Sequence, residues 1–544
     1  MSRSSRYQAL VRLKDENNTE MFFSKHILQI FLSNLHKQIL SYKNMVIETV
    51  QKETHKKKAI VIGAGIAGLS SAIRLQNSGF QVSVFEMNEY PGGKLTAFSE
   101  QGYRFDMGPS LFTMPHFVDE LFTVSNKNPE DYFSYKRKDT VCHYFYKDGT
   151  TFQAASKEKE FASKAASTFD VSEDDILNYF KKSKKKYDLT SSLFLENSLH
   201  KLSTYLTKDT LKAIFKVRSL DVNTSLHDYN AKSFNDPKLV QLFDRFATYN
   251  GSSPYQTPGI MSMIPHLEQY YGTFFPEGGM HSITKSIYQL ALDLGVKFHF
   301  NSKVEKIIIQ NKKAVGVFCN NKDYLADYII SNSDVVSTYR TLLKDQKAPE
   351  KTLNQPRSSS ALIFYWGIKK EFPTLDLHNI FFSDDYKQEF EHIFEKNNVY
   401  EDPTVYLNIT SKENKADAPK GCENWFVMVN VPSNTGQDWD NIIEKTRNKV
   451  LRKLSVSLSV NIKDLIEFEM VLDPRLIESK TMSYQGALYG ASSNNKFAAF
   501  LRHPNFSQQI SNLYFCGGSV HPGGGIPLCL LSGKIVSELI LKNT

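Results

Sequence analysis

The chain has 544 residues, and this length predicts a large hydrophobic core divided over two or three domains. Apolar residues make up 41% and charged residues 23%, which is typical of a globular protein. The formal net charge is +8, but no basic tract dominates, so we expect no nucleic-acid partner.

The first predicted element is a helix from Met21 to Leu40, within an N-terminal extension at residues 1–57. Charged and polar residues interrupt its apolar run, which argues against a membrane-spanning helix. One apolar side could lie on a membrane surface; it consists of Phe23, Ile27, Ile30, Phe31 and Leu35. The alternative, which we favour, is that the native chain starts at Met45 and residues 1–44 do not belong to it; the extension to residue 57 could also be flexible.

Residues 56–86 predict a unit that binds a dinucleotide. The apolar run "AIVIG" is of strand type, the next segment has helical periodicity, and "QVSVFE" alternates as a second strand. Gly63, Gly65 and Gly68 form a G-x-G-x-x-G sequence between the first strand and the helix, and Glu86 ends the second strand. A lone G-x-G-x-x-G is a weak signal. Here the strand, turn, helix, strand and terminal acid all occur at the required spacing.

Each glycine of this unit has its own expected role. Gly63 permits the tight turn, Gly65 lets a pyrophosphate approach the backbone, and Gly68 lets the helix pack against the strand. The helix N-terminus, which includes Ile66 and Ala67, supplies N–H donors and a partial positive charge. We therefore expect this turn to bind the pyrophosphate.

The residues that follow distinguish FAD from NAD. Glu86 can accept hydrogen bonds from ribose hydroxyls and would repel a 2′-phosphate, which disfavours NADP. Gly92, Gly93 and Lys94 add a second glycine pair with a cation, and "FDMGPS" contains Gly108. These segments resemble the G-G-[RK] motif and the D-x-G turn of flavoproteins of the amine oxidase and carotenoid desaturase superfamily. The resemblance implies FAD as the cofactor, with the glycine pair at the pyrophosphate and Gly108 near the flavin.

A middle segment of the chain also resembles part of this superfamily. A Gly-Gly turn precedes a predicted helix from Ser282 to Leu294, Gly295 caps the helix, and the strands "VKFHFN" and "VEKIIIQ" follow. In the superfamily a valine of this segment, here Val304, binds adenine through its backbone. The alternative is an ordinary βα unit without a cofactor contact.

The glycine-rich stretch "CGGSVHPGGGIPLCLLSGK" predicts a third return of the chain to the cofactor. "NLYFCGG" is expected to form a final strand, and Pro527 suits the first turn of the helix that follows. The resemblance implies that Gly517 and Gly518 pack at the flavin. It also implies that the helix N-terminus faces the N1/O2 edge of the ring, where its N–H groups stabilise developing negative charge. That N-terminus consists of Ile526, Pro527 and Leu528.

His521 is the one titratable group inside this loop. It either positions flavin or substrate, or relays a proton, or only hydrogen-bonds its own loop; the catalytic residues stay unknown. Many relatives carry Asp or Glu where Gly518 stands, so the ending resembles the bacterial carotenoid desaturase branch more than the amine oxidase branch. We expect Cys516 and Cys529 to be small buried apolar residues.

No metal or hydrolytic site is predicted. G-x-S-x-G, H-E-x-x-H and a cysteine pair with zinc spacing are all missing from the sequence. The five cysteines are scattered and no secretory signal precedes them, which indicates a reducing cytosolic compartment.

The resemblance extends from about Lys58 to the C-terminus and implies an α/β fold. A Rossmann-like FAD-binding domain of the GR2 type is expected from the discontinuous segments 58–125, 270–340 and 475–544. A mixed α+β domain for substrate and membrane is expected from 126–269 and 341–474. The aromatic-rich regions Phe112–Tyr271 and Leu362–Val431 would line its tunnel.

The activity implied by the resemblance is that of an FAD-dependent carotenoid desaturase. A hydride passes from an allylic carbon to the flavin and a proton leaves the neighbouring carbon, while the protein aligns the C–H bond. The implied partners are a lipid-soluble carotenoid substrate, a membrane surface that the cytoplasmic enzyme binds peripherally, and quinone or O2 as electron acceptor. "GGSVHPGGGIP" favours a 3,4-desaturase of hydroxylated acyclic carotenoids; phytoene desaturase is the alternative.

Other functions stay open at this point. One is another flavin oxidase of the same fold, such as an amine oxidase or a protoporphyrinogen oxidase. Another is a non-enzymatic protein similar to the Rab GDP-dissociation inhibitors. The lysine run Lys181–Lys186 is interpreted as a solvated helix face, with attraction to anionic lipid as the alternative.

Overall fold

The computed structural model describes residues 10–14, 20–24, 33, 35–41, 43, 56–191, 220–494 and 502–543. The chain divides into two compact units, Met1–Lys57 and Lys58–Thr544. In the first unit, β1 (Leu10–Lys14) pairs antiparallel with β2 (Glu20–Ser24).

The helix predicted from Met21 is wrong at its start, because Phe23 lies in strand β2 and pairs with Val11. The helical periodicity of this segment could not reveal the strand partner that precedes it. Leu35 lies in a helical segment and is exposed, whereas Ile27, Ile30 and Phe31 lie outside the described residues.

A five-stranded parallel sheet lies at the centre of one half of the second unit, with the strand order β12-β4-β3-β16-β22. Its strands come from three distant parts of the chain: β3 (Lys58–Ile62), β4 (Gln81–Phe85), β12 (Lys297–His299), β16 (Tyr328–Ser331) and β22 (Leu513–Phe515). Central strands of a parallel sheet are covered on both faces; β16 is accordingly buried throughout, and β3 is buried except for Lys58. The predicted α/β class and Rossmann-like sheet are confirmed.

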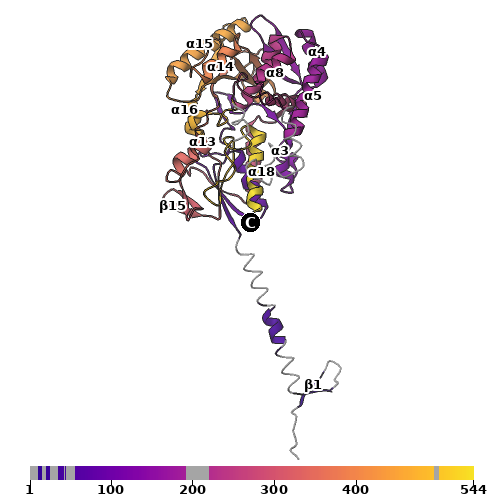
Figure 1. Ribbon diagram of the computed structural model, residues 1–544, viewed down its shortest axis with the longest axis vertical. Helices are drawn as coiled ribbons and strands as arrows, with labels where there is room; N and C mark the ends of the chain where they lie inside the picture. The colour runs from indigo at the N-terminus through magenta and orange to yellow at the C-terminus, as the bar shows by residue number, and fades with distance from the viewer. Residues whose placement is uncertain are drawn as a thin grey trace, which may run out of the picture. The chain divides into compact units, whose positions relative to one another are not determined.

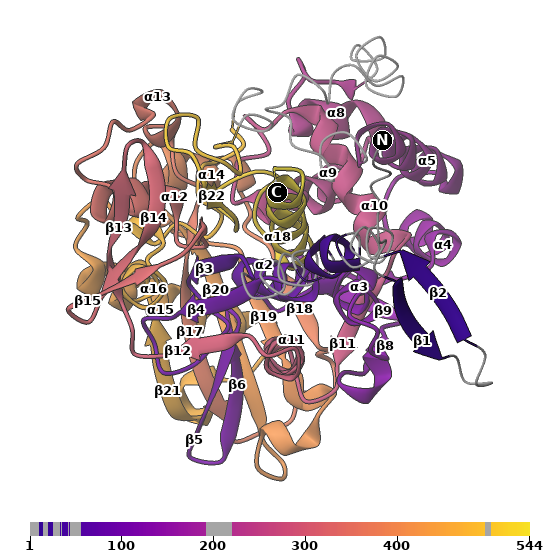
Figure 2. The same ribbon diagram turned by 90° about the horizontal axis from the view of Figure 1, so that it is seen from below.

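Helices α2 (Ile66–Asn77), α11 (His281–Asp293) and α18 (Ile526–Leu541) pack with this sheet in one hydrophobic core. Figure 2 shows α2 and α18 side by side, although about 450 residues separate them in the chain. The contact is close because Gly533 has no side chain: a Cβ there would lie 2.7 Å from the Ala67 carbonyl oxygen. Ser70 Oγ donates to the carbonyl of Leu530 at 3.1 Å across the same contact.

A seven-stranded mixed sheet forms the other half, with the order β10-β9-β18-β19-β20-β17-β21. The β9–β18 pair is parallel and the remaining pairs are antiparallel. The strands are β9 (Thr140–Phe145), β10 (Thr151–Ala155), β17 (Ser360–Ile368), β18 (His378–Phe381), β19 (Val405–Ile409), β20 (Glu423–Val431) and β21 (Ile466–Leu472).

Smaller sheets complete the second unit: β5 (Thr96–Glu100) with β6 (Tyr103–Met107); β7 (Phe112–Thr113), β11 (Thr273–Pro276) and β8 (Tyr135–Arg137); and β13 (Val304–Gln310), β14 (Lys313–Cys319) and β15 (Lys322–Leu325). The predicted helix near Ser282–Leu294 and the strand at Val304 are confirmed.

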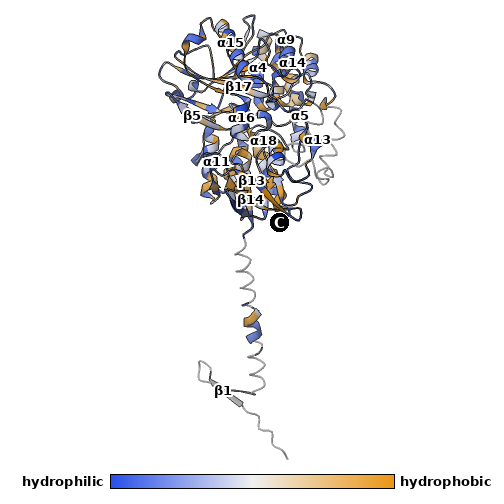
Figure 3. Ribbon diagram, turned by 90° about the vertical axis from the view of Figure 1, so that its left-hand side faces the viewer, coloured by the Kyte–Doolittle hydropathy of each residue, from blue (hydrophilic) through white to orange (hydrophobic). Residues whose placement is uncertain are grey.

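The remaining helices are α3 (His116–Thr123), α4 (Glu158–Thr168), α5 (Glu173–Thr190), α8 (Leu226–Ser233), α9 (Pro237–Asp244), α10 (Ile264–Gln269), α12 (Val335–Ser337), α13 (Glu350–Leu353), α14 (Tyr386–Phe394), α15 (Trp439–Ser457) and α16 (Pro474–Thr481). Figure 1 shows α4, α5 and α8 gathered at one side of the seven-stranded half and α14 and α15 at the other. Among the described residues, none of the helices has the length and apolar character needed to cross a bilayer. Figure 3 shows hydrophilic residues on the outer helices and predominantly hydrophobic residues on β13 and β14.

The lysine run on α5 is only partly a solvated face. Lys181, Lys182, Lys184 and Lys185 are exposed, as predicted. Lys186 is buried: its Nζ lies 2.8 Å from Asp221, donates to Ser262 Oγ at 2.7 Å and lies 3.5 Å from the centre of the Tyr229 ring. A buried ammonium needs such partners because desolvation opposes its charge.

Candidate active site

A single large cavity of about 570 Å³ connects the carboxyl ends of the parallel strands with the face of the seven-stranded sheet. Binding sites of doubly wound folds lie at this end of the strands. The predicted cofactor residues that line the cavity are Gly63, Gly65, Ile66, Ala67, Glu86, Gly92, Gly93, Lys94, Gly108, Val304, Gly517, Gly518, Ile526, Pro527 and Leu528. Gly68 does not line it.

The turn between β3 and α2 has the geometry of a phosphate-binding turn. Gly63 has a φ of +97°, which L side chains rarely adopt, and Gly65 is the N-cap of α2 without a side-chain cap. A Cβ at Gly68 would lie 2.3 Å from the Gly63 carbonyl oxygen, so Gly68 is needed for helix packing. The free N–H groups at the start of α2 are thus available to an anion in the cavity.

The carboxylate of Glu86 is buried beside this turn and has partners on both oxygens. The backbone N–H of Ala64 donates to Oε2 at 2.7 Å. The backbone N–H and side-chain Nδ2 of Asn88 both donate to Oε1 at 2.9 Å. Oε1 accepts two hydrogen bonds and Oε2 only one, so Oε2 has a lone pair to which a ribose hydroxyl could donate.

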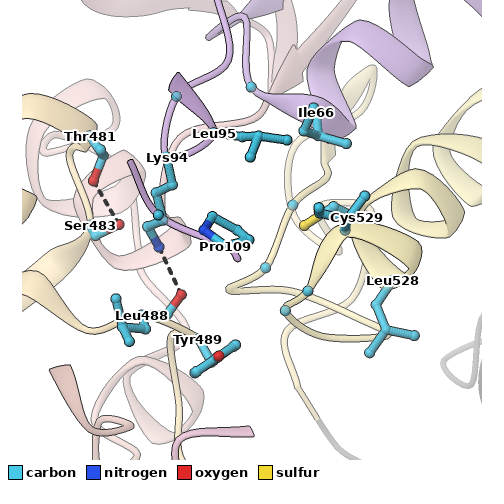
Figure 4. A pocket seen from close by; sticks show the side chains of 18 of the residues that line it. Ile66, Lys94, Leu95, Pro109, Thr481, Ser483, Leu488, Tyr489, Leu528 and Cys529 are labelled. Atoms are coloured by element: carbon cyan, nitrogen blue, oxygen red, sulfur yellow. Dashed lines mark hydrogen bonds between the residues drawn. The ribbon is translucent and has the colours of Figure 1, made fainter. Parts of the chain in front are cut away.

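The second glycine pair lies directly against the first turn. Gly92 forms a bridge with Gly65, and its N–H donates to the Ala64 carbonyl at 2.9 Å. A Cβ at Gly93 would lie 3.5 Å from the Cα of Gly65. Lys94 is half-buried, and its Nζ donates to the Leu488 carbonyl at 2.8 Å (Figure 4). Burial lowers the pKa of Lys94, and nearby Asp334 partly offsets this effect.

Asn332 lies between the β3–α2 turn and the glycine-rich loop at Gly517, and this role was not predicted from the sequence. It directly follows the buried strand β16, and its Nδ2 donates to the Gly63 carbonyl at 3.3 Å. Cβ atoms at Gly65 and Gly517 would lie 2.7 Å from Nδ2 and 3.0 Å from Oδ1 of Asn332. A polar residue immediately after a buried parallel strand was the available signal.

The glycine-rich loop before α18 forms the opposite wall. Gly525, with a φ of +101°, is the N-cap of α18 and supplies no side-chain cap. Figure 4 shows Leu528 and Cys529 on this wall, facing Pro109 and Lys94 across the cavity. The structure therefore directs two helix N-termini without side-chain caps, those of α2 and α18, at one cavity. These residues fit a dinucleotide with a ring system that becomes negatively charged.

Arg502 holds the glycine-rich loop before α18 in place through hydrogen bonds. This role was not predicted from the sequence either. It is buried, lines the cavity and donates through Nη1 to the Tyr489 carbonyl at 2.6 Å and to the Gly518 carbonyl at 3.3 Å. Burial, with Arg357 contributing, lowers the pKa of Arg502 to about 10. A donor fixed on two carbonyls holds the loop close to the cavity.

His521 is buried and lines the cavity. Its backbone N–H donates to the His503 carbonyl at 3.0 Å, and its own carbonyl accepts from Asn505 at 2.7 Å and Ser532 at 2.9 Å. Cys516 is buried as predicted, and burial raises its pKa to about 12; Cys529 is half-buried at the cavity wall. No cluster suited to a metal ion occurs within 56–191, 220–494 and 502–543 or the other described residues.

The part of the cavity at the seven-stranded sheet is mainly apolar. Both aromatic-rich regions of the sequence contribute to it, through Phe117, Val141, Tyr249, Met261, Ile264, Leu267, Ile363, Ile380, Tyr386 and Met428. A few polar residues stand among them: the buried Arg245, Glu268 and His378, and the half-buried Tyr406. None of these four was singled out in the sequence, because their proximity depends on the fold.

Comparison with known proteins identifies similar chains over nearly the whole length. The family model described as flavin containing amine oxidoreductase matches residues 66–541. A 1-hydroxycarotenoid 3,4-desaturase from Flavobacterium sp. is 58% identical over 484 residues, which is 89% of this chain and 99% of that protein. A 4,4'-diapolycopene oxygenase from Methylomonas sp. is 33% identical over 90% of this chain and 98% of its own. The solved structure of cyclohexylamine oxidase from Brevibacterium oxydans has a TM-score of 0.57 at 14% identity, covering 90% of this chain and 99% of that one, and shows the shared fold.

Proposed function

We propose that this chain, which belongs to the flavin containing amine oxidoreductase family and is an FAD-dependent oxidoreductase, desaturates the 3,4 bond of an acyclic carotenoid that carries a hydroxyl group at C1. The observation that carries the proposal is the cavity itself. One end of the cavity is lined by the glycine turns and Glu86 and has the features of a dinucleotide site. The other end, at the seven-stranded sheet, is mainly apolar and is called the chamber below. The chain is also 58% identical over 484 residues to a 1-hydroxycarotenoid 3,4-desaturase.

Named residues would hold the cofactor. We propose that segments 58–125, 270–340 and 475–544 form the FAD-binding domain, and that 126–269 and 341–474 form the substrate domain. The N–H groups at the start of α2 would face the pyrophosphate, Glu86 the ribose, and the Val304 backbone the adenine. The start of α18 would face the ring edge where negative charge develops.

The protein's own contribution to the reaction is binding and exclusion of water. FAD, when bound, supplies the acceptor for the hydride that leaves the substrate. The apolar side chains of the chamber hold the polyene, keep water away and fix which C–H bond faces the cofactor. Alignment of the C–H bond with the cofactor is enough for most of the chemistry, because the reacting polyene has no charged group to be polarised.

The experiment is expression in two carotenoid-producing hosts, one that accumulates a 1-hydroxylated acyclic carotenoid and one that accumulates phytoene. We expect a red-shifted product with two hydrogen atoms fewer in the first host, and unchanged phytoene in the second. Conversion of phytoene alone would support the phytoene desaturase alternative. A product that gains oxygen would instead resemble the activity in the name of the Methylomonas relative.

The substrate dissolves only in lipid, so we also propose that the enzyme works on a membrane surface. Four exposed lysines precede Tyr187 on α5, and Tyr187 lines the cavity. Tyr270 is 53% exposed, and the ammonium of Lys184 lies 5.4 Å from the centre of its ring. Lysines next to exposed aromatic rings suit an anionic lipid surface.

Liposomes test the membrane proposal. We expect turnover to require them and to fall when Lys181, Lys182 and Lys185 are replaced by glutamine. Full turnover of lipid-free enzyme with dispersed substrate would contradict it. The same assay run without O2, with and without added quinone, distinguishes the two proposed electron acceptors.

A further inference from the structure

The chamber contains a buried ion pair that a hydrocarbon would not need. Nη2 of Arg245 donates to both oxygens of Glu268, at 2.8 and 3.1 Å, and Nε donates to the Tyr144 hydroxyl at 2.7 Å. Arg245 is 7% exposed and Glu268 2% exposed, and both line the cavity. Buried ion pairs are often no more stabilising than apolar side chains of the same volume, so stability alone is a weak reason for this one.

The ion pair has unused hydrogen-bonding capacity. Nη1 of Arg245 makes no hydrogen bond to a described residue, and each Glu268 oxygen accepts from only one donor atom, Nη2. Burial raises the pKa of the Glu268 carboxyl, and Arg245 counteracts this shift. A hydroxyl group can both donate to Glu268 and accept from Arg245, whereas a methyl group can do neither.

A second group of hydrogen-bonded polar side chains also lines this cavity. Ser110 Oγ is 2.8 Å from the Tyr406 hydroxyl, which is 2.8 Å from His378 Nδ1. The amide nitrogen of Asn408 also contacts Nδ1, at 3.2 Å. Nδ1 therefore accepts, and the proton of the neutral ring is on Nε2. Burial, reinforced by Lys138 and Arg245, lowers the pKa of His378 to about 3, which keeps the ring neutral.

His378 Nε2 is buried and has no hydrogen-bond partner among the described residues, while the side chain lines the cavity and is 3% exposed. Buried polar atoms without a partner are rare in folded proteins, because each loses the hydration it had in the unfolded chain. Such an atom indicates a missing ligand group or an ordered water.

The position of these groups agrees with the chemistry of the proposed substrate. The oxygen on C1 is four single bonds from C4, so it lies within about 5 Å of the bond that becomes unsaturated. A hydroxyl site must then be near the reacting end of the cavity. Ser110 directly follows Gly108 and Pro109, and Figure 4 shows Pro109 between Lys94 and the α18 wall.

We propose that Tyr406 and His378, together with the Arg245–Glu268 pair, form a subsite that binds the hydroxyl group on the end of the substrate. This inference rests on the proposed function and adds the residues that select a hydroxylated end group. The subsite discriminates because an end group without the hydroxyl leaves Nη1 of Arg245, Nε2 of His378 and the second lone pairs of the Glu268 oxygens without partners after water is displaced.

The test compares two substrates with the same polyene, one with the C1 hydroxyl and one without, in liposomes with FAD-loaded enzyme. We expect the wild type to prefer the hydroxylated substrate in kcat/KM by about 100-fold or more. Tyr406→Phe should reduce this preference by about tenfold, through a loss confined to the hydroxylated substrate. Tyr146→Phe is the matched control: it also removes a buried hydroxyl that makes a hydrogen bond, here to the Lys238 carbonyl at 2.9 Å, but Tyr146 does not line the cavity.

A double variant tests the ion pair without leaving a lone buried charge. Arg245→Met combined with Glu268→Gln should fold, since both charges leave together, and should reduce the preference by about 10- to 100-fold. Equal losses on both substrates would mean that these residues only support the fold and would overturn the inference. Equal kcat/KM of the wild type for both substrates would overturn it while leaving a desaturase function intact. An FAD-loaded wild type that converts neither substrate would overturn the proposed function and the inference together.

Discussion

Replacing Glu86 by glutamine should weaken FAD binding and destabilise the β3–α2 turn by separate mechanisms. In the wild type, three donors point at the two carboxylate oxygens, at 2.7 to 2.9 Å. An amide has only one acceptor oxygen, which the two donors of Asn88 would retain. The amide NH2 would then face the Ala64 N–H, donor against donor.

The magnitudes follow from these contacts. Loss of the charge-assisted hydrogen bond from Ala64 should lower the free energy of unfolding by about 1.5–3 kcal/mol. This loss does not depend on the cofactor. If the ribose hydroxyls also donate to the carboxylate, a similar free energy is lost from binding, and the Kd for FAD should rise by about 10- to 100-fold.

Thermal unfolding across a series of FAD concentrations separates the two effects. The midpoint without FAD reports on the turn, and the rise of the midpoint with FAD concentration reports on Kd. Glu89→Gln is the control. It makes the same chemical change three residues further along the chain, at a side chain that is exposed. A Glu86→Gln protein that is destabilised but binds FAD as tightly as the wild type would refute the ribose contact: Glu86 would then serve the Ala64 turn alone.

Three other predictions test the remainder of the site. Gly65→Val should purify folded but without flavin absorbance, because even a Cβ at this position would lie 2.7 Å from Asn332 Nδ2 and the valine would fill the pyrophosphate approach; full flavin content would disprove the assignment. Leu528→Glu should lower the reduction potential of the bound flavin by some tens of millivolts, below an upper bound of about 85 mV, while Leu528→Gln should not; an unchanged potential in the flavin-loaded glutamate variant would show that this helix start does not face the ring. His378 has a folded-state pKa of about 3, below the unfolded value of about 6.5, so its contribution to stability is complete above about pH 6.5 and is lost as the pH falls toward 3. The unfolding free energy of His378→Gln should therefore fall less between pH 7 and pH 4 than that of the wild type, and parallel curves would contradict the buried neutral ring.

The local elements of the dinucleotide unit could be predicted from sequence because their determinants are close together in the chain. Gly63, Gly65 and Gly68 lie within six residues, and strand periodicity on either side is visible in single segments. The start of α18 could be predicted in the same way, since Pro527 and the preceding glycines mark a helix N-terminus.

The polar residues of the chamber could not be predicted in the same way. Arg245 and Glu268 are 23 residues apart on separate elements, and neither position has a periodicity that distinguishes it from a surface ion pair. The contact of Tyr406 with Ser110 spans 296 residues. Only the packing of β18 and β19 against the rest of the cavity wall brings these residues to one place. The wrong helix start at Met21 has a related cause, because its strand partner lies outside the segment whose periodicity was considered.

The strand order of the parallel sheet has a consequence for synthesis of the protein. β22 and α18 occupy the last 32 residues of the chain, yet β22 pairs with β16 and α18 packs on α2, which begins at residue 66. A ribosome therefore has to synthesise β22 and α18, which follow α2 far along the chain, before the first nucleotide-binding turn receives its opposite wall. Until those two elements emerge, the buried faces of β16 and α2 lack their natural cover and are open to chaperones or to wrong partners. A nascent chain stalled before residue 513 should accordingly be unable to retain FAD, however complete its seven-stranded sheet has become.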